Sequence, residues 1–195
     1  MVDIQKQRWT PETYLAFERA SEEKHEFIDG SVYAMTGASE NHNLINTNIT
    51  AELVIQLRKR PCKVYANDMR VRIPGYNYVY PDIAIVCGEA QLEDDQLDTL
   101  LNPTVIIEVL SPSTEQYDRG KKFEHYRALE SLQEYLLVSQ EQAHIERFTR
   151  QEAGWLLTEA KGLEATLDLL AIGCVLALAD VYDKVNFEAE SSTSG

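Results

Sequence analysis

Apolar residues recur with helical spacing in two stretches of the first third of the chain. The first stretch follows Thr10, which suits a helix N-cap, and Pro11, which is favoured in a first helical turn. The second runs from Asn41 to Lys59 and stops before Pro61, a residue that cannot continue a helix. The pattern predicts a helix that opens at Pro11 and a second helix over residues 41–59.

Short runs of β-branched and aromatic residues predict strands around these helices. Residues 25–35 are typical of a hairpin, because Asp29-Gly30 supplies a two-residue turn between two such runs. A loop is expected at residues 74–77, and an acidic loop at residues 88–102. The other expected strands cover residues 63–66, 70–73, 82–86, 104–110 and 134–139, with a hairpin formed by 144–148 and 155–159.

The stretch from Thr104 to Leu110 is almost continuously apolar, which is typical of a central strand covered on both faces. A helix from about residue 118 to residue 129 is expected after it, and Leu169–Ala179 is expected to be a buried closing segment. Together the elements predict an α/β fold in which helices flank a central mixed sheet. We expect one domain over residues 1–188 and a disordered tail over residues 189–195.

Two carboxylates interrupt the hydrophobic runs. Asp82 leads into the strand that ends at Val86, and Glu108 lies inside the apolar strand. Acidic residues form strands poorly and are costly to bury, so each needs a partner, and a divalent cation is one such partner. For Asp82 the capping of local amides is an equal alternative. For Glu108 the alternative is a buried ion pair with an arginine, and we favour the functional role.

A lysine follows on the predicted helix. Asp118, Lys122 and Tyr126 are spaced four apart and therefore share one helical face. We expect Lys122 to steady an attacking water or the phosphate, with Asp118 and Tyr126 orienting it. Taken alone, Asp118 and Lys122 are more simply an ordinary surface pair, so this hypothesis depends on Asp82 and Glu108 as well.

The pattern predicts a site for Mg²⁺, or for Mn²⁺ in its place. Hard cations prefer oxygen ligands, which Asp82, Glu108 and the main-chain carbonyl of Val109 would supply. A metal held there would lower the pKa of a bound water and neutralise charge on a phosphate. We therefore expect metal-dependent phosphodiester hydrolysis.

Two more residues are candidates for this site. Glu26 stands just before the Asp29-Gly30 turn and would add a catalytic carboxylate, and the sequence leaves its role undecided. His42 opens the second helix, where it would either approach a phosphate or cap the helix, and we favour capping. The histidines show no H-E-x-x-H spacing, which argues against a zinc site.

A net charge of -14 argues against a general nucleic-acid binder, because phosphate contacts need lysine and arginine. Basic residues nevertheless gather between Arg58 and Arg72 and between Arg119 and Arg127. The main alternative to a nuclease is a non-catalytic nucleic-acid or protein-interaction module with the same fold. A phosphohydrolase acting on nucleotides or RNA is a weaker third hypothesis.

The cysteines and the first residues of the chain indicate the cellular compartment in which the protein is expected. Cys62, Cys87 and Cys174 are far apart in sequence, so we expect small buried hydrophobes in a reducing compartment, without disulfides or zinc. The first residues lack the apolar core of a secretory signal, and residues 169–179 are too few to cross a bilayer. We expect a cytoplasmic protein with no membrane segment.

Several sequence blocks along the chain form a recognisable set. The blocks are E-F-I-D-G (26–30), H (42), Y-P-D-I-A-I-V (80–86), I-I-E-V-L-S-P-S-T (106–114), D-R-G-K-K-F-E-H-Y (118–126) and L-Q-E-Y-L-L-V (132–138). The most specific part is E-V-L-S-P-S-T followed by D-x-x-x-K-x-x-x-Y. With these blocks the chain resembles the bacterial Uma-two family of restriction-endonuclease-like proteins, a branch of the PD-(D/E)XK nuclease superfamily, from about residue 10 to residue 185.

The resemblance implies a restriction-endonuclease-like core and metal-dependent cleavage of DNA. It makes Asp82 and Glu108 metal ligands and Lys122 the catalytic lysine. The superfamily pattern places a lysine two residues after the acid, where this chain has Leu110. The next helix must therefore provide the lysine, with Lys121 as the second choice. We expect a homodimer, because cutting two DNA strands favours two copies of one active site.

Overall fold

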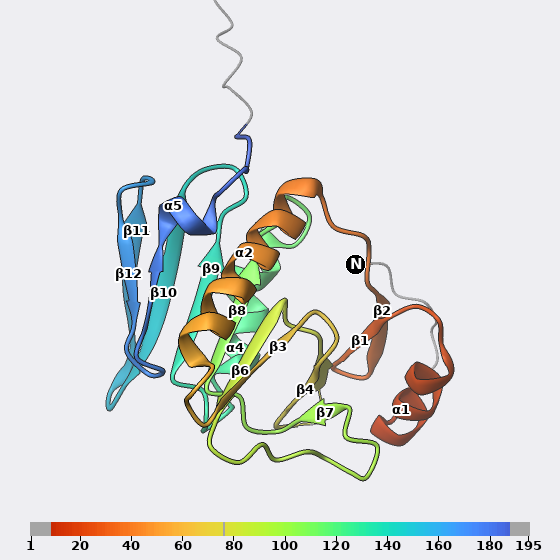
Figure 1. Ribbon diagram of the computed structural model, residues 1–195. Helices are drawn as coiled ribbons and strands as arrows, with labels where there is room; N and C mark the ends of the chain where they lie inside the picture. The colour runs from red at the N-terminus through yellow and green to blue at the C-terminus, as the bar shows by residue number, and fades with distance from the viewer. Residues whose placement is uncertain (1–8, 76, 188–195) are drawn as a thin grey trace, which may run out of the picture.

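A six-stranded sheet forms the centre of the molecule in the computed structural model, which describes residues 9–75 and 77–187 (Figure 1). Strands β8 and β9 run parallel, and the other neighbouring pairs run antiparallel. The predicted mixed sheet is therefore confirmed. In spatial order the strands are β11 (Gly154–Lys161), β10 (His144–Gln151), β9 (Glu134–Val138), β8 (Val105–Val109), β6 (Ile83–Cys87) and β3 (Cys62–Ala66).

A second sheet of five strands lies beside the first. The predicted hairpin is confirmed, with positive φ angles of 52° at Asp29 and 85° at Gly30, as a tight hairpin turn requires. The order is β2 (Ser31–Ala34), β1 (His25–Ile28), β5 (Asn77–Val79), β4 (Arg70–Ile73) and β7 (Thr99–Leu100), and α1 (Pro11–Ala20) covers the hairpin. Two short strands were not predicted: β7 falls in the predicted acidic loop, and β5 starts at the last residue of the predicted loop over 74–77, because runs of two or three residues are too short to show alternation.

Helix α2 (Glu40–Leu57) lies across one face of the central sheet (Figure 1). Its buried residues Ile45, Ile49 and Leu53 belong to one core with the inward-facing residues of β6, β8 and β9. The N-cap of α2 is Ser39, whose hydroxyl accepts the main-chain N–H of His42. The prediction that His42 caps this helix was wrong, because the hydroxyl three residues earlier already fills that role.

The opposite face of the sheet is covered by a short continuous helical stretch. It consists of α3 (Glu115–Tyr117), a π-helical turn η1 (Asp118–Lys122) and α4 (Phe123–Tyr126). Phe123 and Tyr126 pack with Tyr135 of β9. The helix predicted over residues 118–129 therefore begins and ends about three residues earlier, and its middle part, η1, is wound more widely than an α-helix.

The C-terminal part forms a ribbon of β12 (Thr166–Leu169) and β13 (Cys174–Ala177), followed by α5 (Leu178–Val181). The predicted buried closing segment is only half buried: Leu169 and Leu176 are in the core, whereas Leu170 and Val175 are exposed. A two-stranded ribbon has one face on the core and the other in solvent, so alternate residues are exposed. The predicted tail over residues 189–195 lies outside the described residues.

Cys62 and Cys87 form a disulfide. The prediction that they are reduced cysteines was wrong, because β3 and β6 pair in a register that sets these two residues opposite each other. Their separation of 25 residues gives no sign of this. Cys174 is free and buried, as expected.

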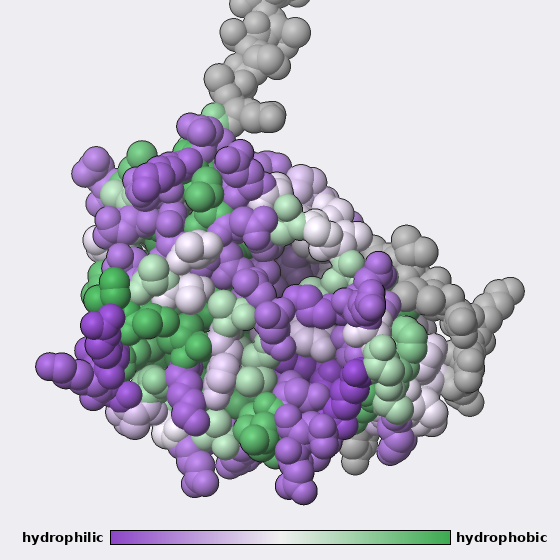
Figure 2. Space-filling model, turned by 45° about the vertical axis from the view of Figure 1, so that its right-hand side comes forward, coloured by the Kyte–Doolittle hydropathy of each residue, from purple (hydrophilic) through white to green (hydrophobic). Residues whose placement is uncertain are grey.

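Hydrophilic residues cover most of the face shown in Figure 2, and apolar side chains appear there in separate patches. Two arginines of the predicted basic group, Arg70 and Arg72, are used in ion pairs with acids of the 88–102 segment. This segment is therefore tied to the second sheet. Among the described residues, no helix is long and apolar enough to cross a membrane.

Candidate active site

The pairing of β6 with β8 brings the two strand carboxylates together. Ile83 faces Ile107 in this antiparallel pair, so Asp82, one residue before β6, comes beside Glu108. The strands β6 and β8 are neighbours as expected, although Asp82 stands just before its strand and not on it. Glu108 is 4% exposed, in the middle of a strand that is buried along its whole length.

Lys122 lies among three acids, Glu26, Glu108 and Asp118. We call these four residues the catalytic cluster, after the role that the sequence predicts for Lys122. The ammonium Nζ lies 2.8 Å from Glu108 Oε1, 3.5 Å from Asp118 Oδ1 and 3.6 Å from Glu26 Oε1. All four residues are more than nine-tenths buried. The surface-pair explanation for Lys122 therefore does not hold, because both it and Asp118 are inside the protein.

Lys121 points elsewhere. Its side chain is 55% exposed and pairs with Asp29 in the β1–β2 turn. Of the two lysines that the family pattern leaves open, the structure brings only Lys122 to Glu108.

Tyr126 contacts the glutamate and not the lysine. Its hydroxyl donates a hydrogen bond of 2.8 Å to Glu108 Oε1, the same oxygen that Lys122 approaches. The predicted role of Tyr126 in orienting Lys122 stays a prediction, since the two groups share Glu108 Oε1. Asp118 keeps its predicted position beside the ammonium.

Asp82 is held from two sides. Its Oδ2 accepts the main-chain N–H of Val109 at 2.7 Å, and its Oδ1 lies 2.9 Å from His42 Nε2. His42 thus reaches the site from the first turn of α2, a role that the sequence did not reveal, because a lone histidine carries no spacing signal. The contact found for Val109 is made by its N–H, and metal ligation by its carbonyl stays a prediction.

Glu26 joins the cluster from the other sheet. It lies on β1, is 4% exposed, and its carboxylate accepts the main-chain N–H of Tyr80 at 3.1 Å. The sequence left this residue undecided, since nothing local shows that β1 and the helical stretch after β8 meet in space.

The electrostatics of the catalytic cluster follow from burial. Burial raises the pKa of Glu108 to about 8, and the nearby Asp118 and Asp82 act in the same direction. Burial also raises the pKa of Glu26. Burial alone would lower the pKa of Lys122, but Glu108 and Glu26 outweigh it and hold the pKa well above its ordinary value. The cluster therefore contains more acid than base.

This imbalance fits a divalent cation. Three buried carboxylates surround one ammonium, and a buried charge is stable only when it is paired. The donors offered by Asp82, Glu108 and the Val109 main chain are oxygen atoms, which Mg²⁺ prefers. The residues present are therefore of the right kind and charge to hold a hard cation.

A different group, His144, Glu146 and Glu159, has its candidate ligand atoms within 4.8 Å of one another. Its acids are already neutralised, because Glu146 pairs with Arg119 and Glu159 with Lys161. This surface group therefore lacks the excess of acids over bases that the catalytic cluster has.

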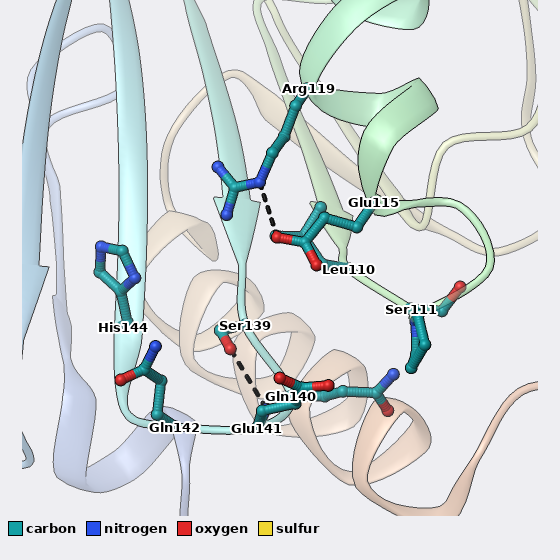
Figure 3. A pocket seen from close by; sticks show the side chains of 10 residues that line it. Leu110, Ser111, Glu115, Arg119, Ser139, Gln140, Glu141, Gln142 and His144 are labelled. Carbon is teal, nitrogen blue, oxygen red and sulfur yellow. Dashed lines mark hydrogen bonds and ion pairs between the residues drawn. The ribbon is translucent and has the colours of Figure 1, made fainter.

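A polar cavity of about 60 Å³ opens beyond the carboxyl ends of β8 and β9 (Figure 3). Ser111 follows β8, Gln140 follows β9, and Arg119 and His144 line the cavity from η1 and β10. Gln140 also accepts a hydrogen bond from Ser39, the cap of α2. The cavity adjoins the end of the Glu108 strand, and its volume is too small for a nucleotide.

Comparison with known proteins places the chain among nuclease-like proteins. The sequence model of the Uma2 family, described as "Putative restriction endonuclease", matches residues 11–179. Two uncharacterized proteins of Synechocystis sp. are similar: slr1290 is 36% identical over 91% of this chain and 93% of its own length. The other, sll1609, is 35% identical over 82% of this chain and 91% of its own length.

The fold is also found among solved structures. A structure described as a "putative nuclease belonging to DUF820" from Anabaena variabilis is similar, with a TM-score of 0.73 and 16% identity. The match covers 89% of this chain and 97% of that chain, so the likeness extends over nearly the whole restriction-endonuclease-like fold. On the strength of the family match over residues 11–179, this chain belongs to the Uma2 family.

Proposed function

We propose that this protein is a metal-dependent endonuclease that hydrolyses phosphodiester bonds of DNA, with Mg²⁺ as its metal and Mn²⁺ as a substitute. The observation that carries the proposal is the contact of 2.8 Å between Lys122 Nζ and Glu108 Oε1, buried among further carboxylates. Buried, charge-imbalanced groups of this kind are typical of catalytic sites. Membership of the Uma2 family supports the same reaction class.

Asp82, Glu108 and the carbonyl of Val109 would hold the metal. When bound, a divalent cation supplies Lewis acidity and lowers the pKa of a coordinated water. The hydrogen bonds from His42 and from the Val109 amide fix both oxygens of Asp82. The Tyr126 hydroxyl fixes one oxygen of Glu108, Oε1. The ligands are therefore oriented before any metal arrives.

Lys122 would act on the water or the phosphate, and the remaining acids would position its ammonium group. In hydrolysis a water oxygen bonds to phosphorus, the bond from phosphorus to the leaving oxygen breaks, and a proton lost by the water is balanced by one gained at that oxygen. Lys122 donates a hydrogen bond to the water or to a phosphoryl oxygen. Asp118 and Glu26 hold the ammonium in place, at 3.5 Å and 3.6 Å.

The test is nicking of supercoiled plasmid by purified protein with Mg²⁺ or Mn²⁺, beside the Glu108→Gln variant. This substitution keeps the size of the side chain and removes its charge. We expect metal-dependent nicking by the native protein and none by the variant, with both proteins folded by circular dichroism. Equal nicking by the two proteins would overturn the proposal.

A non-catalytic interaction module remains the competing function, and the net charge of -14 is the observation in its favour. Calorimetric titration with Mn²⁺ separates the two, because a module without chemistry has no need for a metal at Asp82 and Glu108. Absence of both binding and nicking would favour the module.

We also propose that the active form is a homodimer, since two copies of one site cut two strands. Sedimentation velocity at micromolar concentration tests this, and a monomer that cuts both strands at full rate would contradict it.

A further inference from the structure

Tyr117 has a buried hydroxyl that the mechanism above does not use. This tyrosine is the last residue of α3, and its ring packs against the core on the α4 side of the sheet. Its hydroxyl oxygen is inaccessible to solvent and has no hydrogen-bond partner among the residues that the structure describes. A buried polar atom without a partner destabilises the folded protein, so its presence calls for an explanation.

The hydroxyl belongs to the catalytic cluster by its surroundings. The charges that act on it are those of Glu26, Lys122, Asp118 and Glu108, the four members of that cluster. Tyr117 stands five residues before Lys122. In a regular α-helix two such residues point about 140° apart. The π-helical turn between them widens the winding to i→i+5 and brings them towards one side.

Other tyrosine hydroxyls near the cluster are already used. Tyr126 donates to Glu108, and Tyr135 donates to the main-chain carbonyl of Asp118. Burial, reinforced by Glu26, raises the pKa of Tyr117, so this hydroxyl keeps its proton and can only serve as a donor or a neutral acceptor.

The missing partner is an acceptor. Glu108 Oε1 already accepts from Lys122 and Tyr126, Glu26 Oε1 accepts from the Tyr80 amide, and Asp118 Oδ1 lies beside Lys122. A water bound to a cation is mainly a donor, because its lone pair faces the metal. A phosphoryl oxygen is an acceptor, and Lys122 alone in the cluster is a cationic donor for it.

We propose that Tyr117 is a further catalytic residue of this site and that its hydroxyl donates a hydrogen bond to a phosphoryl oxygen of the bound phosphodiester. The inference rests on the proposed function and adds a second donor beside Lys122. Its substrate is a phosphodiester anion.

The first test compares Tyr117→Phe with Tyr182→Phe. The Tyr182 hydroxyl is the matched control, because it bonds to the main-chain carbonyls of Ser139 and His144. For Tyr117→Phe we expect a kcat for nicking roughly 10–100-fold lower, with Mn²⁺ affinity unchanged and a melting temperature equal to or above that of the native protein. For Tyr182→Phe we expect the opposite: a lower melting temperature and an unchanged kcat. Native kcat in Tyr117→Phe would overturn the proposal.

The second test does not require turnover. 3-Fluorotyrosine is placed at position 117 alone, and its ¹⁹F resonance is followed on addition of Ca²⁺ and then of a phosphorothioate duplex that is not cut. We expect the resonance to shift with the duplex. A shift with Ca²⁺ alone that the duplex leaves unchanged, or no shift at all, would overturn the proposal.

The two tests also separate this inference from the proposed function. A duplex-induced shift in a protein that never nicks DNA would defeat the nuclease proposal and keep the phosphoryl contact. If the native protein nicks DNA and Tyr117→Phe keeps the native kcat, the nuclease proposal stands and the phosphoryl contact is refuted.

Discussion

Two groups of charged side chains join distant parts of this chain, and they are built differently. One is the catalytic cluster, with three carboxylates around the single ammonium of Lys122. The other, which we call the arginine cluster, ties α1 and β4 to the acidic segment through two guanidinium groups and two carboxylates. Its ion pairs are 2.8 Å long and join Arg19 to Asp94 and Asp98, and Arg70 to Asp98.

The two clusters differ in the balance of positive and negative charge and in their exposure to solvent. The arginine cluster matches positive with negative charge, and three of its four side chains are about a third exposed. Hydrogen bonding from Arg19 holds the pKa of Asp98 well below its ordinary value. In the catalytic cluster burial moves the pKa of Glu108 in the opposite direction. A balanced group stabilises the fold as it stands, whereas an unbalanced buried group is prepared for a ligand.

The largest effect is expected from Lys122→Met. Removing the ammonium leaves the buried carboxylates unpaired, which costs about 3–5 kcal/mol of the free energy of unfolding. Urea unfolding at pH 8 measures this loss, and nicking should disappear as well.

The matched control is Lys121→Met, one residue away. Its ion pair with Asp29 is exposed, so we expect a loss below about 1 kcal/mol and normal nicking. Equal stability losses in the two variants would contradict the contrast between a buried and an exposed lysine.

Added metal should stabilise the folded protein through the proposed ligands Asp82 and Glu108, and not through the arginine cluster. At a Mg²⁺ concentration about 100 times Kd, we expect the free energy of unfolding to rise by about 2.7 kcal/mol. Thermal unfolding with and without Mg²⁺ shows this as a higher melting temperature. Glu108→Gln should lose the rise and Asp98→Asn should keep it, and a rise that survives in Glu108→Gln would place the metal elsewhere.

His42→Gln tests the support of a metal ligand. Loss of the imidazole that holds Asp82 should weaken Mn²⁺ binding about 10–100-fold, the usual effect of removing a partner of a ligating carboxylate. Calorimetric titration measures the change. His125→Gln is the control, because His125 lies beside Asp29 outside the site, and weakening by both variants would refute a specific role for His42.

A small effect is expected from Asp98→Asn in the arginine cluster. Solvent screens this partly exposed pair, so the loss should be about 1 kcal/mol at pH 7. Because the pKa of Asp98 is lowered in the folded state, its contribution is present above the ordinary value of 3.8 and is lost as the pH falls further. The difference in the free energy of unfolding between variant and native protein should therefore be smaller at pH 3 than at pH 7. A difference that grows towards pH 3 would contradict this sign.

The sequence predicted which residues form the site better than it predicted the contacts that each of them makes. Glu108 was recognisable because an acid inside an apolar strand needs a partner, and Lys122 because it stands four residues after Asp118. The specific partners were less accessible: Tyr126 contacts Glu108 and not Lys122, and His42 contacts Asp82 instead of capping α2. Which neighbour each of these side chains contacts depends on residues that only the packed sheet brings close to it.

What the sequence determined by itself is local. Periodic apolar residues, caps and turns defined the hairpin at Asp29-Gly30, the long helix and the central strands, since each depends on residues close along the chain. The tertiary structure decided which of these segments meet. Antiparallel register set Asp82 beside Glu108 and Cys62 opposite Cys87, and the second sheet brought Glu26 to Lys122. Pairing between residues tens of positions apart depends on the whole packed core, so no local pattern of side chains encodes it.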